Sequence, residues 1–200
     1  MNTYRTIASR GEGFFKDRGS KFFAFAFPVT TEEEIRQCQD ELRKEYHDAR
    51  HHCFAWVLGM KEVHHRANDD GEPAHSAGDP ILGQIRSLEL TNVLVVVVRY
   101  FGGTKLGVAG LINAYRTAAA EALQDTSTVE VFPEVEFIVQ YDYSETNEAE
   151  RLLAAFPMRV LSRSFESDCQ VRATIHEELF PKLVAAKSPT ARLTIKLLTE

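Results

Sequence analysis

The sequence predicts an α+β protein of two domains, residues 1–127 and 133–200. Strand-like and helix-like segments alternate along the chain, and the first domain is rich in βαβ units. A segment of polar and β-branched residues around one proline, 126–133, interrupts this pattern and is interpreted as the linker. Two hundred residues are enough for a hydrophobic core on each side of it.

The first elements follow from apolar spacing. Phenylalanines over 22–27 indicate a strand that Pro28 ends. Thr31 and Glu34 have the spacing of a capping box, and apolar residues then recur at helical intervals, which predicts an amphipathic helix over 31–46. The pattern continues with a short strand at 53–58, a polar loop at 59–79 and a short helix beginning at Pro80.

Residues 93–100 form the best strand in the chain. The run is apolar on both faces, which is typical of a central strand. Glycines follow it, and a helix with Leu111, Ala114 and Tyr115 on one face comes next. Trp56 and the phenylalanines are interpreted as core residues.

The second half has the order βαββαβ. Strands are expected at 135–141, 160–165, 170–175 and 192–198, and helices at 148–156 and 177–187. This order is that of the split-βαβ, ferredoxin-like arrangement.

Composition narrows the classes of function. The net charge is −6, and residues up to 127 carry 15 basic and 17 acidic side chains, a net charge of −2 that leaves −4 for the rest. Any contact with nucleic acid must therefore be a local patch. The N-terminus lacks an apolar signal region, no apolar run reaches the ~18 residues of a membrane helix, and the three cysteines form no CxxC pair. A cytoplasmic protein is expected.

The glycine-rich segment after the strand at 93–100 predicts an anion site. Glycines let a ligand approach the backbone, and the following helix directs free N–H groups toward the same space. The segment matches neither GxxxxGK[ST] nor GxGxxG, so a tight turn that needs glycine for packing remains the alternative. The candidate anion- or nucleic-acid-binding residues are Arg99, Gly102, Gly103, Lys105, Gly107 and Gly110.

Six of the seven histidines lie between His47 and His75, together with several carboxylates. HExxH and other metal spacings are absent, so no metal site is assigned, and a solvated loop is the alternative. Cys53 and His52 are neighbours on a strand and point to opposite faces, so no catalytic pair is assigned. The candidate recognition loop consists of Asp69, Asp70, Gly71, Glu72 and His75.

Four segments together resemble the IMPACT family, in particular its bacterial YigZ-type members. They are KDRGSKFFAFAFPV (16–29), HDARHHCFAW (47–56), NDDGEPAHSAGDPIL (68–82) and VVVVRYFGGTKLGVAGLINAY (95–115). The chain departs from the family at His75–Ser76, where Gly-Thr is usual, at Ala109, where glycine is usual, and at Asn113, where a basic residue is usual. Ligand contacts of the family are not carried over to these positions.

The resemblance implies that the first domain is like the fourth domain of elongation factor G, a fold also present in galactokinase-type kinases. It implies that the second domain is like the fifth domain of that factor. Eukaryotic members regulate translation by competing for the activator of an initiation-factor kinase, and RNA or ribosome binding is the usual suggestion for bacterial members. The resemblance brings no catalytic residue and no cofactor.

Three hypotheses follow. The first is a non-enzymatic, translation-related protein that contacts RNA, the ribosome or a translation-associated protein through its first domain, without DNA specificity and without a membrane. The second is an enzyme acting on a phosphorylated small molecule, with Mg²⁺ on Asp69, Asp70 and Glu72. It is disfavoured because GVAGL lacks the hydroxyls of the GLGSS-like kinase loop. The third is a protein–protein adaptor that uses residues 64–79.

Overall fold

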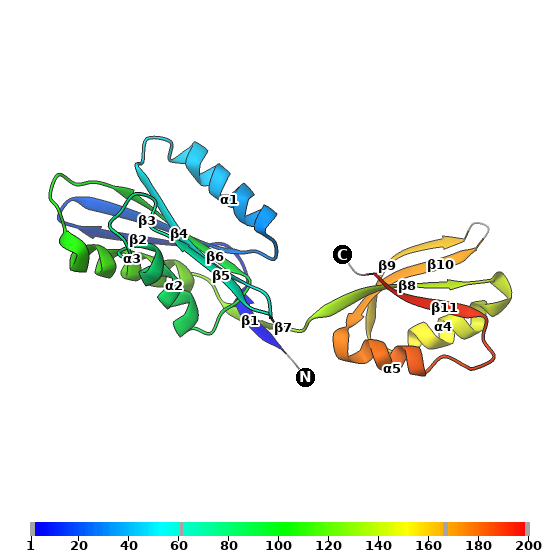
Figure 1. Cartoon of the computed structure of the whole chain (residues 1–200). Helices are drawn as coiled ribbons and strands as arrows, with labels where there is room; N and C mark the ends of the chain where they lie inside the picture. The colour runs from blue at the N-terminus through cyan, green and yellow to red at the C-terminus, as the bar shows by residue number, and fades with distance from the viewer. Residues whose placement is uncertain (1–2, 61, 166–167, 199–200) are drawn as a thin grey trace. The chain divides into compact units, whose positions relative to one another are not determined.

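The structure is a computed structural model that describes residues 3–60, 62–165 and 168–198. The chain divides into two compact units (Figure 1). We call Tyr4–Val131 the N-terminal unit and the residues from Phe132 onward the C-terminal unit. Among the described residues, no helix has the length and apolar character that crossing a membrane requires.

The N-terminal unit is built on a five-stranded sheet in the order β2-β3-β6-β4-β5, in which every pair of neighbours is antiparallel. β6 is central, as its sequence predicts. β1 and β7 form a separate antiparallel pair. The elements are β1 (Tyr4–Ile7), β2 (Gly11–Asp17), β3 (Ser20–Pro28), α1 (Glu32–Glu45), β4 (His51–Leu58), β5 (His64–Asn68), α2 (Gly78–Ser87), β6 (Val93–Tyr100), α3 (Gly107–Gln124) and β7 (Thr128–Val131).

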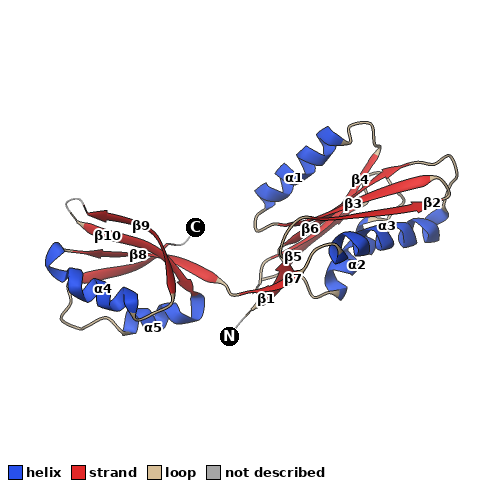
Figure 2. Ribbon diagram, turned by 180° about the vertical axis from the view of Figure 1, so that it is seen from behind, coloured by secondary structure: helices blue, strands red, loops and turns tan. Residues whose placement is uncertain are grey.

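The sheet of this unit is covered on both faces. α1 lies on one face, and α2 and α3 lie on the other (Figure 2). Val93, Val95 and Val97 of β6 pack in the cluster with α2 and α3, whereas Leu94, Val96 and Val98 pack in the cluster with α1. Because successive side chains of a strand point to opposite faces, two apolar layers require an uninterrupted apolar strand between them.

The predicted capping box of α1 is confirmed. The Thr31 hydroxyl accepts the Glu34 N–H at 3.2 Å, and the Glu34 carboxylate accepts the Thr31 N–H at 3.3 Å. These bonds pair N–H groups that the first helical turn would otherwise leave without acceptors. The observed helix lies inside the predicted range of 31–46.

Two segments differ from their predicted state. The predicted polar loop at 59–79 contains β5, which pairs with β4 at the sheet edge. Its sequence, HHRAN, is polar because both faces of this edge strand are largely exposed, so the apolar alternation that identifies strands is missing. Within the predicted linker, Thr128–Val131 forms β7, and the division between the units falls after it.

The C-terminal unit has the expected element order βαββαβ. Its four-stranded antiparallel sheet has the order β11-β8-β10-β9, so each crossover skips one strand. Both α-helices lie on one face, and β9 exposes most of its residues (Figure 1). The elements are β8 (Glu134–Tyr141), η1 (Tyr143–Glu145), α4 (Thr146–Ala154), β9 (Met158–Phe165), β10 (Cys169–His176), η2 (Glu177–Leu179), α5 (Phe180–Ala185) and β11 (Leu193–Leu198).

Candidate functional site

The two candidate loops predicted from the sequence lie at the same end of the strands of the N-terminal sheet. β5 and β6 are both antiparallel to β4, which lies between them, so β5 and β6 run in the same direction. Their carboxyl ends therefore meet at the same edge. We call residues 68–78, after β5, the acidic loop, and residues 101–110, after β6, the glycine loop.

Asp69 ties the acidic loop to the start of α2. One carboxylate oxygen accepts the N–H groups of Ala77 and Gly78 at 2.9 and 2.8 Å, and the other accepts the His75 N–H at 2.8 Å. Burial acts to raise the pKa of Asp69, but these N–H donors outweigh it and hold the pKa below the ordinary value. The carboxylate is thus occupied within the protein.

Asp70 and Gly71 are the central residues of a tight turn. The Glu72 N–H donates to the Asp69 carbonyl at 2.9 Å, and Asp70 and Gly71 have φ values of 39° and 86°. Positive φ at both central positions is the geometry of a type I′ turn. The Asp70 carboxylate accepts the His52 N–H at 2.7 Å and lies 3.6 Å from Arg43.

Glu72 turns inward and meets Arg99. Their side chains are only 4% and 7% exposed, and the guanidinium lies 2.6 Å from Glu72 Oε1. The same oxygen accepts the Tyr115 hydroxyl at 2.7 Å. The Cys53 thiol donates to the Tyr115 oxygen at 3.3 Å and to the Asp69 carbonyl at 2.9 Å. We call Cys53, Glu72, Arg99 and Tyr115 the buried network.

The thiol and the phenol of the buried network are weak nucleophiles. Burial raises the pKa values of the Cys53 thiol and the Tyr115 phenol, so both groups keep their protons near neutral pH. Arg99, which the sequence places among the anion-binding residues, is buried here and has its charge balanced by Glu72. Likewise, Glu72 does not face outward for recognition; the pair joins the acidic loop to the end of β6.

The glycines of the glycine loop have different tasks. A Cβ at Gly102 would lie 1.9 Å from the Gly19 carbonyl carbon, so this position needs glycine for close packing on the β2–β3 turn. A Cβ at Gly110 would lie 2.9 Å from Leu106. Gly103 and Gly107 have φ values of 88° and 74°, and a Cβ at either would meet no heavy atom of the described residues within 4 Å other than those of its chain neighbours and, for Gly107, the nearby backbone of α3. These two therefore border open space.

The N-terminus of α3, beside that open space, has backbone N–H groups that no side chain caps. The N-cap residue, Leu106, offers no side-chain hydrogen bond, and the first turn contains no acidic residue. Lys105 is exposed next to it. Of the predicted anion-binding residues, Gly102, Gly103, Lys105 and Gly107 are exposed, Gly110 is half-buried and Arg99 is buried. Gly103 and Gly107 are the exposed glycines that border open space.

His75 is the outward group of the acidic loop. Its side chain is 82% exposed and Nδ1 lies 2.7 Å from Asp79 Oδ2. Its φ is 63°, in the left-handed region that glycine adopts without strain. Ser76 is fully buried and donates to the Pro73 carbonyl at 2.6 Å.

One group of residues beside the glycine loop was missed from the sequence. A groove of about 420 Å³ is lined by two phenylalanines that the sequence analysis interprets as core residues, together with two tyrosines and a lysine. The usable signal was the basic hairpin KDRGSK, whose two lysines are directly opposite each other. The groove is lined by Gly19, Lys21, Phe23, Tyr46, Tyr100 and Phe101.

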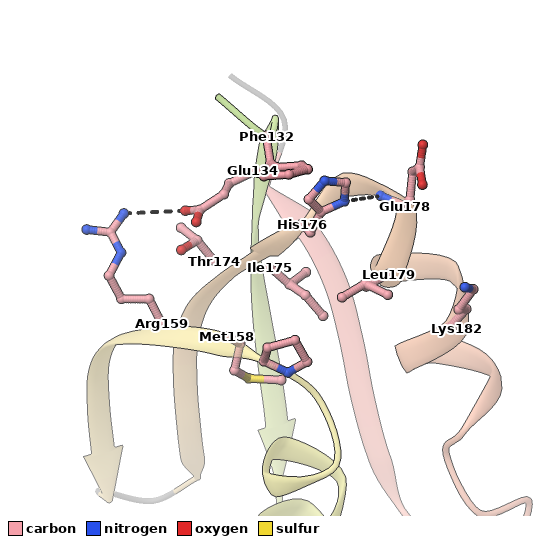
Figure 3. A pocket seen from close by; sticks show the side chains of 11 residues that line it. Phe132, Glu134, Met158, Arg159, Thr174, Ile175, His176, Glu178, Leu179 and Lys182 are labelled. Carbon is pink, nitrogen blue, oxygen red and sulfur yellow. Dashed lines mark hydrogen bonds and ion pairs between the residues drawn. The ribbon is translucent and has the colours of Figure 1, made fainter. Parts of the chain in front are cut away.

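The C-terminal unit has a pocket of its own, of about 440 Å³ (Figure 3). Phe132, Met158 and Ile175 give it apolar walls. His176 Nδ1 accepts the backbone N–H of Glu178 at 3.3 Å, so in neutral His176 the proton is on Nε2. Within the described parts of the chain, that Nε2 and the Thr174 hydroxyl are buried without a hydrogen-bond partner. No motif in the sequence indicates this pocket.

Comparisons with known proteins place both loops within one known type of domain. The family model described as the Impact N-terminal domain matches residues 18–123, which include the acidic and glycine loops. A solved structure described as that of a hypothetical protein is 26% identical to this chain and has a TM-score of 0.74. The match covers 100% of this chain and 99% of the solved chain.

Two curated relatives are bacterial. The IMPACT family member YigZ of Escherichia coli is 30% identical over 193 residues, a match that covers 86% of this chain and 95% of YigZ. The IMPACT family member YvyE of Bacillus subtilis is 37% identical over 130 residues, which are 65% of this chain and 60% of YvyE. The chain therefore belongs to the IMPACT family.

Proposed function

We propose that this protein is a non-enzymatic regulator in translation that contacts RNA or the ribosome through its N-terminal unit. The observation that carries the proposal is the open space bordered by Gly103, Gly107, the uncapped start of α3 and Lys105. Backbone N–H groups and a lysine bind phosphate oxygens without reading bases. The chain belongs to the IMPACT family, and the link to translation is what the resemblance to that family implies.

The carboxylates of the acidic loop do not oppose this assignment. Asp69 accepts three backbone N–H groups, Asp70 accepts the His52 N–H, and Glu72 is paired with Arg99. These negative charges are thus stabilised by donors within the protein. A polyanion at the glycine loop meets Lys105 rather than a row of free carboxylates.

The same contacts weigh against a magnesium-dependent enzyme that acts on a phosphorylated small molecule. That hypothesis needs carboxylate oxygens of Asp69, Asp70 and Glu72 for the cation. In the structure these carboxylates accept hydrogen bonds from the protein itself. No cofactor is proposed.

Co-sedimentation with ribosomes tests the proposal. We expect wild type to pellet with ribosomes at about 50 mM salt and much less at about 200 mM, because phosphate contacts release counterions. Lys105→Glu should weaken pelleting, whereas Lys196→Glu, in the C-terminal unit, should not. Wild type that stays in the supernatant at both salts, or equal loss in both variants, overturns the proposal.

Arg99 is unsuitable as the test residue because its loss leaves Glu72 buried without its partner.

The adaptor hypothesis predicts a different outcome, a protein partner that is captured from extract and survives nuclease treatment. Capture that is lost with nuclease supports RNA contact instead.

A further inference from the structure

The groove beside the glycine loop is aromatic and basic. We call Phe23, Tyr46, Tyr100 and Phe101, with Lys21, the aromatic groove. It lies where α1 ends, since Tyr46 is the C-cap of that helix. Its volume of about 420 Å³ is within the ~300–1,000 Å³ of small-ligand sites.

Three rings of the aromatic groove contact one another, and the Arg99 guanidinium lies 5.7 Å from the ring centroid of the fourth, Phe101. Phe23 stacks against Tyr46 at a centroid distance of 5.9 Å and an interplanar angle of 28°, and meets the edge of Tyr100 at 6.0 Å. Phe14, opposite Phe23 on β2, extends the row at 5.0 Å and is 47% exposed. Phe101 is 56% exposed. Exposed rings that neighbours hold rigid lose little freedom when a flat ligand stacks on them.

Basic side chains surround these rings. Lys16 and Lys21 are directly opposite each other on β2 and β3, and Lys21 is opposite Tyr100 on β6, so all three share the face of the groove. Arg18, in the turn between the two strands, and Lys105, in the glycine loop, are exposed. Among the described residues, none forms an ion pair with Lys16, Lys21 or Lys105. The carboxylate of Asp48, at the groove, accepts the Tyr100 hydroxyl at 2.6 Å.

We propose that the aromatic groove binds single-stranded RNA, with bases stacked on Phe101 and Phe23 and phosphates held by Lys16, Lys21 and Lys105. This inference deepens the proposed function, on which it rests for RNA as the partner. Stacking platforms combined with a positively charged groove are the general means of binding single strands. The bases of a duplex are stacked on each other and do not reach such rings.

The charge distribution selects RNA over a protein segment. The chain as a whole has a net charge of −6, yet Lys21 lines this groove and Lys16 lies opposite Lys21 on the same face of the sheet. Lysines beside the rings repel a basic peptide and give an apolar one no counterpart, whereas a nucleic acid strand supplies both phosphates for the lysines and flat bases for the rings. The glycine loop borders the groove, because Phe101 belongs to the loop and also lines the groove.

Fluorescence anisotropy with a labelled single-stranded RNA of about 12 nucleotides, a length within the binding-site sizes of single-strand binders, tests the stacking. Phe101→Ala should weaken binding about 5- to 100-fold, the range of one stacked base. Phe132→Ala is the matched control, because Phe132 is a 46% exposed phenylalanine of the C-terminal unit. Equal effects of both substitutions, or an unchanged affinity of Phe101→Ala, overturn the inference.

A tryptophan reporter gives a second measurement that does not depend on loss of affinity. Phe101→Trp keeps a stacking surface, and the natural Trp56 is only 7% exposed. Single-stranded RNA should quench the emission of the new tryptophan, and a duplex of the same sequence should quench it much less. Equal quenching by the two overturns base stacking.

The phosphate contacts have a separate readout. Lys21→Gln should reduce the slope of log affinity against log salt by about 0.7, the contribution of one phosphate on a single strand. An unchanged slope contradicts the placement of the strand on this face.

The two proposals fail separately. Single-stranded RNA binding that Phe101→Ala weakens, without any ribosome pelleting of wild type, supports the groove and refutes the ribosome. Ribosome pelleting that is lost in Lys105→Glu and unchanged in Phe101→Ala, with no quenching in Phe101→Trp, refutes the groove alone.

Discussion

Arg99 and Glu72 show how one residue pair serves the whole site. The pair joins the acidic loop to the end of β6 at 2.6 Å, and Arg99 also lies over the Phe22 ring at 5.5 Å. Bringing two charges out of water costs nearly as much as their attraction returns, so the net stabilisation of such a pair is small. Removing one partner is costly, because the other charge then stays buried and unpaired.

Arg99→Ala should therefore lower the free energy of unfolding by about 3–5 kcal/mol. Urea denaturation followed by far-UV circular dichroism measures this change. Lys105→Ala, at an exposed position of the neighbouring loop, should stay within about 0.5 kcal/mol of wild type. A loss of less than about 1 kcal/mol for Arg99→Ala contradicts a buried pair.

Because the pKa of Cys53 is raised in the folded protein, the free energy of unfolding should fall as the pH rises through the alkaline range. Below the ordinary thiol pKa of 9.0, folded and unfolded chains both keep the proton. Above it the unfolded thiol loses its proton while the buried thiol retains it, so the free energy of unfolding falls by up to ~1.4 kcal/mol per pH unit. Tyr115, whose pKa burial also raises, adds to the fall from its ordinary pKa of 10.0 upward.

Urea titrations at about pH 7, 9 and 10, which bracket the ordinary thiol pKa, test this prediction. Over the alkaline part of this range, Cys53→Ser should show a shallower loss of stability than wild type, because serine does not titrate there. Near neutral pH the two proteins should have parallel profiles. Parallel profiles over the whole range would mean that the Cys53 thiol does not titrate differently in the two states.

At the scale of elements, the start of α2 depends on a residue outside the helix. Its N-cap position, Ala77, has no side chain that can accept a hydrogen bond. Asp69 replaces the missing cap by accepting the N–H groups of Ala77 and Gly78 from the end of β5. A negative charge at a helix N-terminus is also stabilised by the helix dipole.

Asp69→Ala should destabilise the protein by about 1–3 kcal/mol, because three backbone donors lose their acceptor. Hydrogen exchange of the amides of Ala77 and Gly78 should become faster than in wild type. Asp79→Ala removes a carboxylate of the first turn of α2 that contacts the exposed His75 side chain, and is the control with a small effect. Unchanged protection of both amides in Asp69→Ala would refute the capping role.

At the scale of the whole molecule, the boundary between the units is set by strand pairing. β7 lies within the segment that composition marks as a linker, yet Tyr4–Ile7 pairs with it over four residues. Each unit has its own apolar cluster. The N-terminal unit consequently needs residues up to Val131 to complete its strands.

A fragment of residues 1–131 should unfold cooperatively, and a fragment of residues 1–127 should be less stable by roughly 1–3 kcal/mol, because β1 loses its hydrogen-bonded partner. Thermal and urea unfolding of the two fragments measure the difference. Identical stabilities would show that the pairing of β1 with β7 adds nothing to the unit.

The sequence by itself determined the local elements and the family. The capping box of α1, the central position of β6 and the βαββαβ order of the second half are all encoded in apolar spacing and turn residues, which act over a few positions. β5 escaped prediction because an exposed edge strand carries no apolar alternation. The likeness of the domains to those of elongation factor G stays a prediction.

Only the tertiary structure decided what the loop residues do. The sequence places Arg99 beside Lys105 as a second cation, but strand pairing brings Glu72 against it and removes its charge from the surface. The phenylalanines look alike in the sequence, yet Phe22 is buried while Phe14 and Phe101 are exposed beside basic residues. Burial and pairing depend on contacts between segments far apart in the chain, and no local pattern specifies them.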